Sequence, residues 1–234
     1  MAYQNKQDPD VRSRDGAQPA EPAAGQPKDL IGAISDSFSA GKEIFVDAGE
    51  ILLDTATEHE VLKEVPVVKW LTSAYTVRDA YQTKRLERNT RAFLSALGTQ
   101  APETIHRLRD KVLKDKKFAE EFEDTVTAII LEASKPLKAA LLGNLVRAVA
   151  DDSLDKASFE KLSQLIHSSS VPALRAIPSF LLANENPYKS GIGEIPEEPL
   201  IMSMGLATRS GTMFRMSRDG EALWRWGFRE RPID

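Results

Sequence analysis

The stretch GLATRSGTMFRMSRDGEALWRWG, from Gly205 to Gly227, decides the interpretation of the fold, because it carries the only β-rich pattern in an otherwise helical sequence. Ser210-Gly211 is a hairpin turn signal between two short runs. In the second run, Phe214 and Met216 alternate with polar residues and therefore share one strand face. Ser217 has the side chain of an N-cap, and a glycine closes the stretch. The stretch predicts strand, turn, strand and capped helix.

This order of elements is similar to the wing and closing helix of a winged-helix domain, a module that binds nucleic acid in some proteins and other proteins in many. Three basic residues favour nucleic acid: Arg209, Arg215 and Arg218. Acidic and proline residues at 194–199 oppose it, because they occupy the place of a recognition helix and carboxylates repel phosphate. We therefore expect a wing used for packing or for recognition of a partner protein. Its candidate aromatic anchors are Trp224, Trp226 and Phe228, with burial in the core as the alternative for two of them.

The composition excludes several classes of function. The chain has 234 residues, a net charge of −4 and no cysteine. Disulfide frameworks, thiolate catalysis and cysteine-ligated metals are therefore excluded. The acidic balance opposes a surface built throughout for phosphate and leaves room for one basic face. No signal-peptide pattern precedes Leu30, and no run of about 18 apolar residues could span a bilayer, so we expect a cytoplasmic protein.

No motif for catalysis, cofactor binding or metal ligation is present. HEVLK at His59 begins like a zinc-protease helix, but Lys63 stands where the second histidine is required. GIGEIP at Gly191 has two of the three glycines of a dinucleotide turn and then a proline. The sequence predicts a non-enzymatic protein with no cofactor and no metal. A site assembled from dispersed residues stays open.

The first part of the chain divides into two regions. Residues 1–28 are rich in proline and charge and predict a disordered leader. Residues 29–98 predict a long helical hairpin whose second helix begins at Pro66. The first helix carries apolar residues at every seventh position: Ile31, Phe38, Phe45 and Leu52. This seam favours packing within the chain and permits self-association.

The second helix of this hairpin carries a basic stripe, which we define as Lys84, Arg85, Arg88 and Arg91. The spacing i, i+1, i+4, i+7 places these residues on one helix face. Such a stripe binds phosphate, anionic lipid or an acidic protein surface, or it pairs with the acidic first helix. Trp70 near the start of the same helix raises the alternative of peripheral membrane contact, although burial fits its spacing better.

The remainder of the chain predicts a helical bundle at residues 99–182, a linker at 183–198 and the winged-helix-like module at 199–234. Apolar residues at helical spacing define the bundle helices. Asp155 is the predicted N-cap of one of them. Pro178 is expected to kink or end the last one. The predicted fold class is therefore mainly α, with one small β-hairpin module.

Three segments carry a family resemblance: VPVV at Val65 with the Arg78-Asp79 pair beyond it, ALLGNLVRAVADDSLDKASFEKLS from Ala140, and the MFRMSRDGEALWRWG tail. With these segments the chain resembles uncharacterised bacterial helical proteins, some of them associated with prophages or defence. It is also similar in layout to the abortive-infection alpha family, which implies a role in antiviral defence. The resemblance assigns no functional residue.

Together these observations predict a non-enzymatic component that acts through a protein partner or through self-association. The first alternative is a winged-helix regulator that binds DNA through the C-terminal module. The second is a peripheral membrane effector without a transmembrane span.

Overall fold

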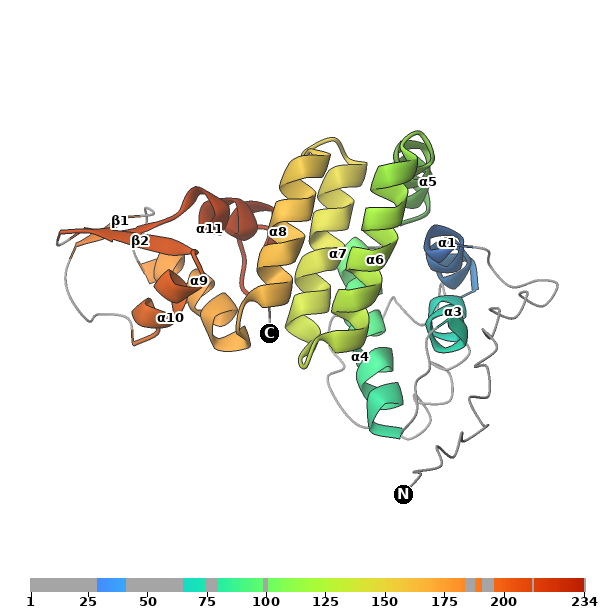
Figure 1. Cartoon of the computed structure of the whole chain (residues 1–234), viewed down its shortest axis with the longest axis horizontal. Coiled ribbons are helices and arrows are strands. Elements are labelled where there is room, and N and C mark those ends of the chain that lie inside the picture. Colours follow the sequence, from blue (N-terminus) through green and yellow to red (C-terminus); the bar gives the residue numbers. More distant parts are fainter. Residues whose placement is uncertain are drawn as a thin grey trace, which may run out of the picture.

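The computed structural model describes residues 29–40, 65–74, 80–98, 101–183, 188–190, 196–211 and 213–233. The chain is mainly helical with one small antiparallel sheet, as the sequence predicted (Figure 1). The predicted leader at 1–28 and the seam positions Phe45 and Leu52 lie outside the described residues.

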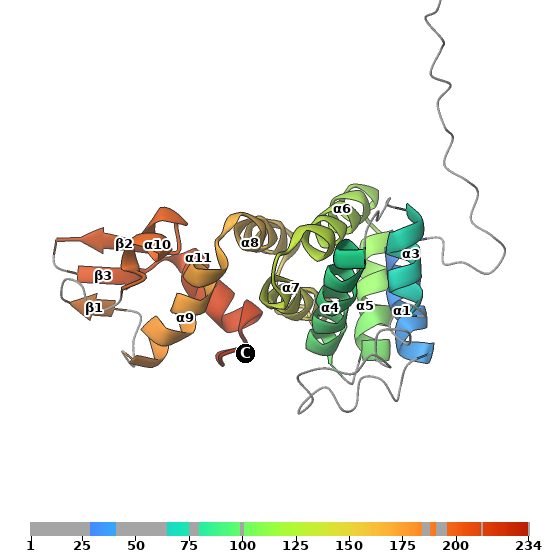
Figure 2. The same ribbon diagram turned by 90° about the horizontal axis from the view of Figure 1, so that it is seen from below.

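The helical bundle is built from the first described elements: α1 (Leu30–Ala40), α3 (Pro66–Ala74), α4 (Ala80–Leu97), α5 (Ala101–Leu113), α6 (Lys116–Glu132), α7 (Pro136–Ala150) and α8 (Lys156–Ser168). A second set forms what we call the C-terminal lobe: α9 (Val171–Ala183), β1 (Tyr188–Ser190), α10 (Glu198–Ser203), β2 (Ala207–Ser210), β3 (Met213–Met216), α11 (Arg218–Ala222) and the π-helix η1 (Leu223–Gly227). Figure 2 shows the bundle at one end of the molecule and the sheet at the other, with α8 between them.

Helix α7 is the centre of the bundle. Every residue from 139 to 146 is buried, and Asn144 is the only polar residue among them. A helix segment that is apolar on nearly every side belongs in a core. Accordingly, α7 packs against α4, α5, α6, α8 and η1.

The closest helix packing occurs where α4 crosses α7. A Cβ atom added to Gly143 would lie 2.4 Å from the carbonyl oxygen of Phe93 and 2.9 Å from the Cβ of Ala96. The two backbones therefore touch, with no side chain between them at this point. Among the described elements, α4 and α7 share the most extensive contact.

Asn89 of α4 is a polar residue that is fully buried near this crossing, because its side-chain amide is hydrogen-bonded. Its Nδ2 donates to the carbonyl oxygens of Ile130 and Ala133, at 2.9 and 2.7 Å. These carbonyls lie at the C-terminal end of α6, where helices leave acceptors without intrahelical donors. A side chain of α4 thus closes the end of α6.

Helices α1 and α3 pack together at the outer side of the bundle. The buried Ser37 Oγ accepts from the backbone N–H of Val67 at 2.9 Å and donates to the carbonyl of Ala33 at 2.7 Å. The predicted helix start at Pro66 is confirmed. Within the predicted helix from Pro66 to Gly98, the structure describes α3 and α4, and residues 75–79 lie outside the description.

An aromatic cluster joins α6 to α8. The rings of Phe122 and Phe159 stack at 5.6 Å, and Phe118 lies 5.9 Å from Phe122. Asp155 caps α8 by accepting from the backbone N–H of Ser158 at 2.9 Å, as the sequence predicted. The caps and the cluster fix where α8 begins and which face it presents.

The sheet of the C-terminal lobe has the strand order β1-β3-β2, with both pairs antiparallel. β3 is therefore central, and Phe214 from it meets Phe180 of α9 edge-to-face at 5.2 Å. The predicted linker at 183–198 contains β1, which sequence reasoning missed because three residues are too few to show alternation. Helix α9 continues through Pro178 to Ala183, so this proline does not end the helix. Ile177 before the proline and Phe180 after it are both buried in the core, and this packing keeps the segment helical.

Replacing Gly143 by alanine tests the crossing of α4 and α7. Alanine in place of glycine would stabilise the helix by about 1 kcal/mol through its higher helix propensity. Its methyl group would, however, overlap the backbone carbonyl of Phe93, and such overpacking costs about 1–3 kcal/mol. We expect Gly143→Ala to lower the free energy of unfolding, measured by chemical denaturation. An unchanged or higher stability would show that the two helices do not approach this closely.

Candidate functional site

The predicted wing arginine Arg209 is engaged within the lobe. Its Nε donates to Glu198 Oε1 at 2.8 Å, and its guanidinium makes a second bond to the same oxygen. The guanidinium also lies over the ring of Phe214, 5.5 Å from its centre. The side chains of Arg209 and Glu198 are only 22% and 13% exposed. This cation therefore ties β2 to α10.

The other two predicted arginines lie apart from it. In the strand register, Arg209 pairs with Phe214 and Arg215 pairs with Thr208. Since neighbouring residues of a strand point to opposite faces, the side chains of Arg209 and Arg215 lie on different faces of the sheet. Arg215 is 4.0 Å from Glu221, and Arg218 is exposed at the start of α11. The three arginines do not form one basic surface.

The three predicted aromatic anchors differ in burial. Phe228 is 1% exposed, so it is a core residue and its ring is not presented to a partner. Trp224 packs against it at 5.8 Å and is half-buried. Trp226 is also half-buried, with Arg225 over its ring at 6.0 Å. Only the two tryptophans keep exposed surface.

The basic stripe lies on the face of α4 that is turned away from its buried residues. Lys84 and Arg88 are exposed, while Arg85 and Arg91 are half-buried. Arg88 reaches the carbonyl of Ser134 in the turn between α6 and α7, at 3.5 Å. Part of the stripe therefore packs on the bundle.

The apolar face of α3 is covered within the protein. Val67, Val68 and Leu71 are 0%, 1% and 0% exposed. Trp70 is half-buried and packs against the same core. Across the described ranges, no helix has both the length and the apolar character for a bilayer crossing.

A cavity of about 430 Å³ opens where α7 ends and η1 crosses it. Its lining residues come from the end of α7 with the following turn and from η1 with the tail: Asn144, Arg147, Ala148, Asp151, Ser153, Arg225, Trp226, Arg229 and Glu230. Sequence reasoning singled out only Trp226 among them. The other residues are scattered over two segments about 80 positions apart, and no spacing rule connects them.

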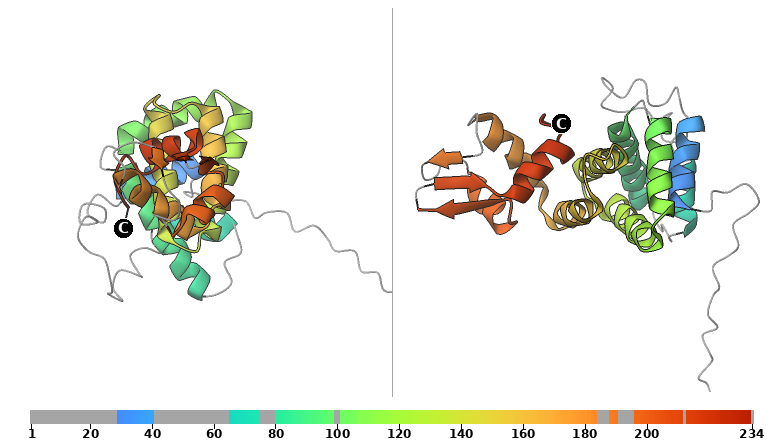
Figure 3. Two further views of the ribbon diagram at one scale, coloured as in Figure 1. Left: turned by 90° about the vertical axis from the view of Figure 1, so that its left-hand side faces the viewer. Right: turned by 90° about the horizontal axis from the view of Figure 1, so that it is seen from above.

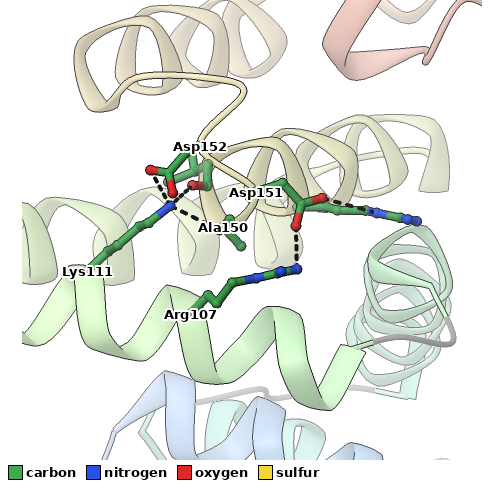
Figure 4. A network of polar contacts seen from close by, with 7 residues as sticks. Arg107, Lys111, Ala150, Asp151 and Asp152 are labelled. Carbon is green, nitrogen blue, oxygen red and sulfur yellow. Dashed lines mark hydrogen bonds and ion pairs between the residues drawn. The ribbon is translucent and has the colours of Figure 1, made fainter.

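A polar network at the end of α7 neutralises its last carbonyls (Figure 4). Lys111 Nζ donates to the carbonyls of Val149 and Ala150 at 2.7 and 2.9 Å and pairs with Asp152 at 2.6 Å. Arg107 pairs with Asp151 at 2.5 Å. Cations suit this place because the last carbonyls of a helix carry partial negative charge.

The charged side chains that line the cavity leave a net positive charge of one. Its lining includes three guanidinium groups and two carboxylates. Arg147 lies 3.8 Å from Asp151, and Arg225 lies 3.8 Å from Glu230. Partial desolvation, followed by repulsion from Arg147 and Arg231, lowers the pKa of Arg229 below its usual value, while Asp151 opposes the shift. Guanidinium groups stay protonated at neutral pH, so they bind anions and do not exchange protons with a substrate.

Asn144 joins the bundle to the lobe at the base of this cavity. Its buried Nδ2 donates to the carbonyl of Gly227 at 2.7 Å. Gly227 itself lies close to α7, since an added Cβ would be 3.3 Å from Leu141. The position of η1, and with it one wall of the cavity, depends on this contact.

No protein-family model, curated protein or solved structure matches the chain. In the part of the chain that the structure describes, no three His, Asp or Glu side chains gather as a metal site would require.

Replacing Asn144 by leucine tests the joint between bundle and lobe. The variant leaves the buried carbonyl of Gly227 without its donor, which costs about 1–3 kcal/mol. We expect a corresponding fall in the free energy of unfolding and a change in tryptophan fluorescence from η1. Gln164→Leu, on the exposed face of α8, is the control and should change stability by less than about 0.5 kcal/mol. If the two variants were equally stable, the hydrogen bond from Asn144 to Gly227 would not stabilise the contact between the bundle and the lobe.

Proposed function

We propose that this chain is a non-enzymatic component of a protein assembly and that it binds its partner protein through the C-terminal lobe. The observation that carries the proposal is the internal engagement of Arg209 by Glu198 and Phe214. A wing that binds DNA needs its cations free to meet phosphate. Here the wing cation of β2, Arg209, is already neutralised by Glu198 of the preceding helix.

The arrangement of the lobe supports a winged-helix-like module. A helix precedes β1, a short helix precedes the hairpin, and the sheet order is β1-β3-β2. The helix in the place of a recognition helix is α10, which has only six residues and begins with a carboxylate. It is too short to fill a major groove. Protein binding is the use of the module that fits these features.

The surface of α10 indicates the chemistry of the partner. Ile201 points into the core, while Leu200 and Met202 on either side of it are 38% and 37% exposed. Of the exposed large apolar residues in the described ranges, only Tyr81 lies elsewhere. Figure 3 shows the lobe projecting from the bundle, which leaves it accessible. We infer a partner protein that offers an apolar patch to α10.

The resemblance to the abortive-infection alpha family supports a role in phage defence, and the identity of the captured partner tests it. The DNA-binding regulator is the alternative that depends on Arg215 and Arg218, the two more exposed of the three wing arginines. The membrane alternative has less support, because the apolar face of α3 is buried against the bundle.

The test is affinity purification of the tagged full-length chain from its native host, at low and moderate salt and with nuclease treatment. We expect a stoichiometric protein partner that Leu200→Asp/Met202→Asp binds at least about ten-fold more weakly, because both side chains would lie in the contact. The control is Arg215→Glu/Arg218→Glu, which changes exposed charge and leaves α10 intact. This variant should retain the partner.

The opposite pattern would favour the regulator. Nucleic acid that dissociates as salt rises, that is lost from Arg215→Glu/Arg218→Glu and that is kept by the α10 variant would contradict the proposal. Circular dichroism and thermal unfolding of both double variants would establish that each one folds.

A further inference from the structure

We propose that the cavity between α7 and η1 binds a small phosphorylated molecule, whose phosphate is held by Arg147, Arg225 and Arg229. This inference is independent of the proposed protein interaction, which uses α10 on another part of the lobe. It assigns a ligand site to residues of two segments that meet only in the folded chain.

The charges around the cavity favour a dianion. Of the two carboxylates that line the cavity, Asp151 is already neutralised by Arg107, which lies outside the lining at 2.5 Å from it. The 3.8 Å contacts of Arg147 with Asp151 and of Arg225 with Glu230 are longer than hydrogen bonds. The guanidinium N–H groups of Arg147 and Arg225 can therefore donate hydrogen bonds to a ligand. The planar fork of a guanidinium matches two phosphate oxygens.

The backbone at Arg229 allows the guanidinium to be removed without strain. Arg229 and Glu230 have φ angles of 56° and 57°, in the left-handed region that favours glycine. The N–H of Glu230 donates to the carbonyl of Trp224 at 3.0 Å, which closes the end of η1. Glycine is the usual residue in such a helix-terminating position. Glycine at position 229 would therefore keep this backbone conformation and remove only the side chain.

Repulsion among the arginines near Arg229 also favours binding of an anion. The pKa of Arg229 is lowered first by partial desolvation and then by repulsion from Arg147 and Arg231. An anion between these groups would replace the repulsion by attraction. A phosphate monoester carries more negative charge than a carboxylate, so it offsets more of this repulsion and better outweighs the nearby Asp151 and Glu230.

The size of the cavity and its aromatic wall indicate more than free phosphate. A volume of about 430 Å³ exceeds what one phosphate group fills and lies in the range of small-molecule sites. Trp226 forms part of the wall and is half-buried, so its indole can stack on a flat group of the ligand. A nucleoside monophosphate combines both features, and AMP is the probe we choose.

Isothermal titration calorimetry on the full-length chain would compare AMP, inorganic phosphate and adenosine. We expect AMP to bind more tightly than phosphate and adenosine not to bind. Arg229→Gly should weaken AMP binding at least about ten-fold, through loss of charge-assisted hydrogen bonds. Arg218→Gln removes one guanidinium from the same lobe outside the cavity and should leave the affinity unchanged.

Thermal unfolding separates this role from a structural one. Arg229→Gly should unfold at the same or a higher temperature than the wild type, because glycine adopts the left-handed conformation without strain. Loss of affinity without loss of stability is the result that a merely structural arginine would not give. Glu230→Gln should strengthen AMP binding by a few-fold, since it removes a negative charge that faces the ligand.

Three results would overturn the proposal. The first is equal AMP affinity of Arg229→Gly and the wild type. The second is binding of adenosine as tightly as AMP, or of phosphate as tightly as AMP, which would remove the phosphorylated small molecule as the ligand. The third is binding of duplex DNA, weakened by Arg229→Gly, in a protein that binds neither AMP nor phosphate.

Discussion

The contact between the backbones of α4 and α7 at Gly143 is the constraint on which the rest of the structure depends. Because no side chain separates the helices there, α7 sits deep enough to be covered on all sides. Its neighbours α5, α6 and α8 and the π-helix η1 then pack around it. Asn89, one of the polar side chains buried near this contact, closes the C-terminal end of α6. At this residue, burial and hydrogen bonding support the same packing of α4 on α6.

The same central helix connects the bundle to the C-terminal lobe. Three successive turns of α7 carry Gly143 and Asn144, then Arg147, then the acidic end at Asp151. The first turn touches α4 and η1, and the later ones border the cavity. Lys161 of α8 adds a further link, because it pairs with Asp219 of α11 at 2.7 Å. The cavity thus has one wall from each part of the molecule, and its shape depends on how they are joined.

The lobe and the cavity divide the arginines of the C-terminal segment into two uses. Arg209 ties β2 to α10 and contributes to the local fold. Arg225 and Arg229 face the cavity beside Arg147, where like charges are concentrated and only partly neutralised. Concentrated charge of one sign is costly in the free protein and becomes favourable when a counter-ion binds. The apolar surface of α10 lies outside both groups and gives the lobe a separate surface for a partner.

The sequence by itself determined the mainly helical class, the helix starts at Pro66 and Asp155, the hairpin turn at Gly211 and the cap at Ser217. These are local features, set by backbone preferences and short-range periodicity, so a window of a few residues contains them. Only the tertiary structure decided that Phe228 is core, that Arg209 is engaged by Glu198, and that Pro178 lies inside a continuous helix. It also decided that Arg147 and Arg229 share one cavity, because proximity between distant segments comes from how helices pack, and no spacing in the chain encodes it.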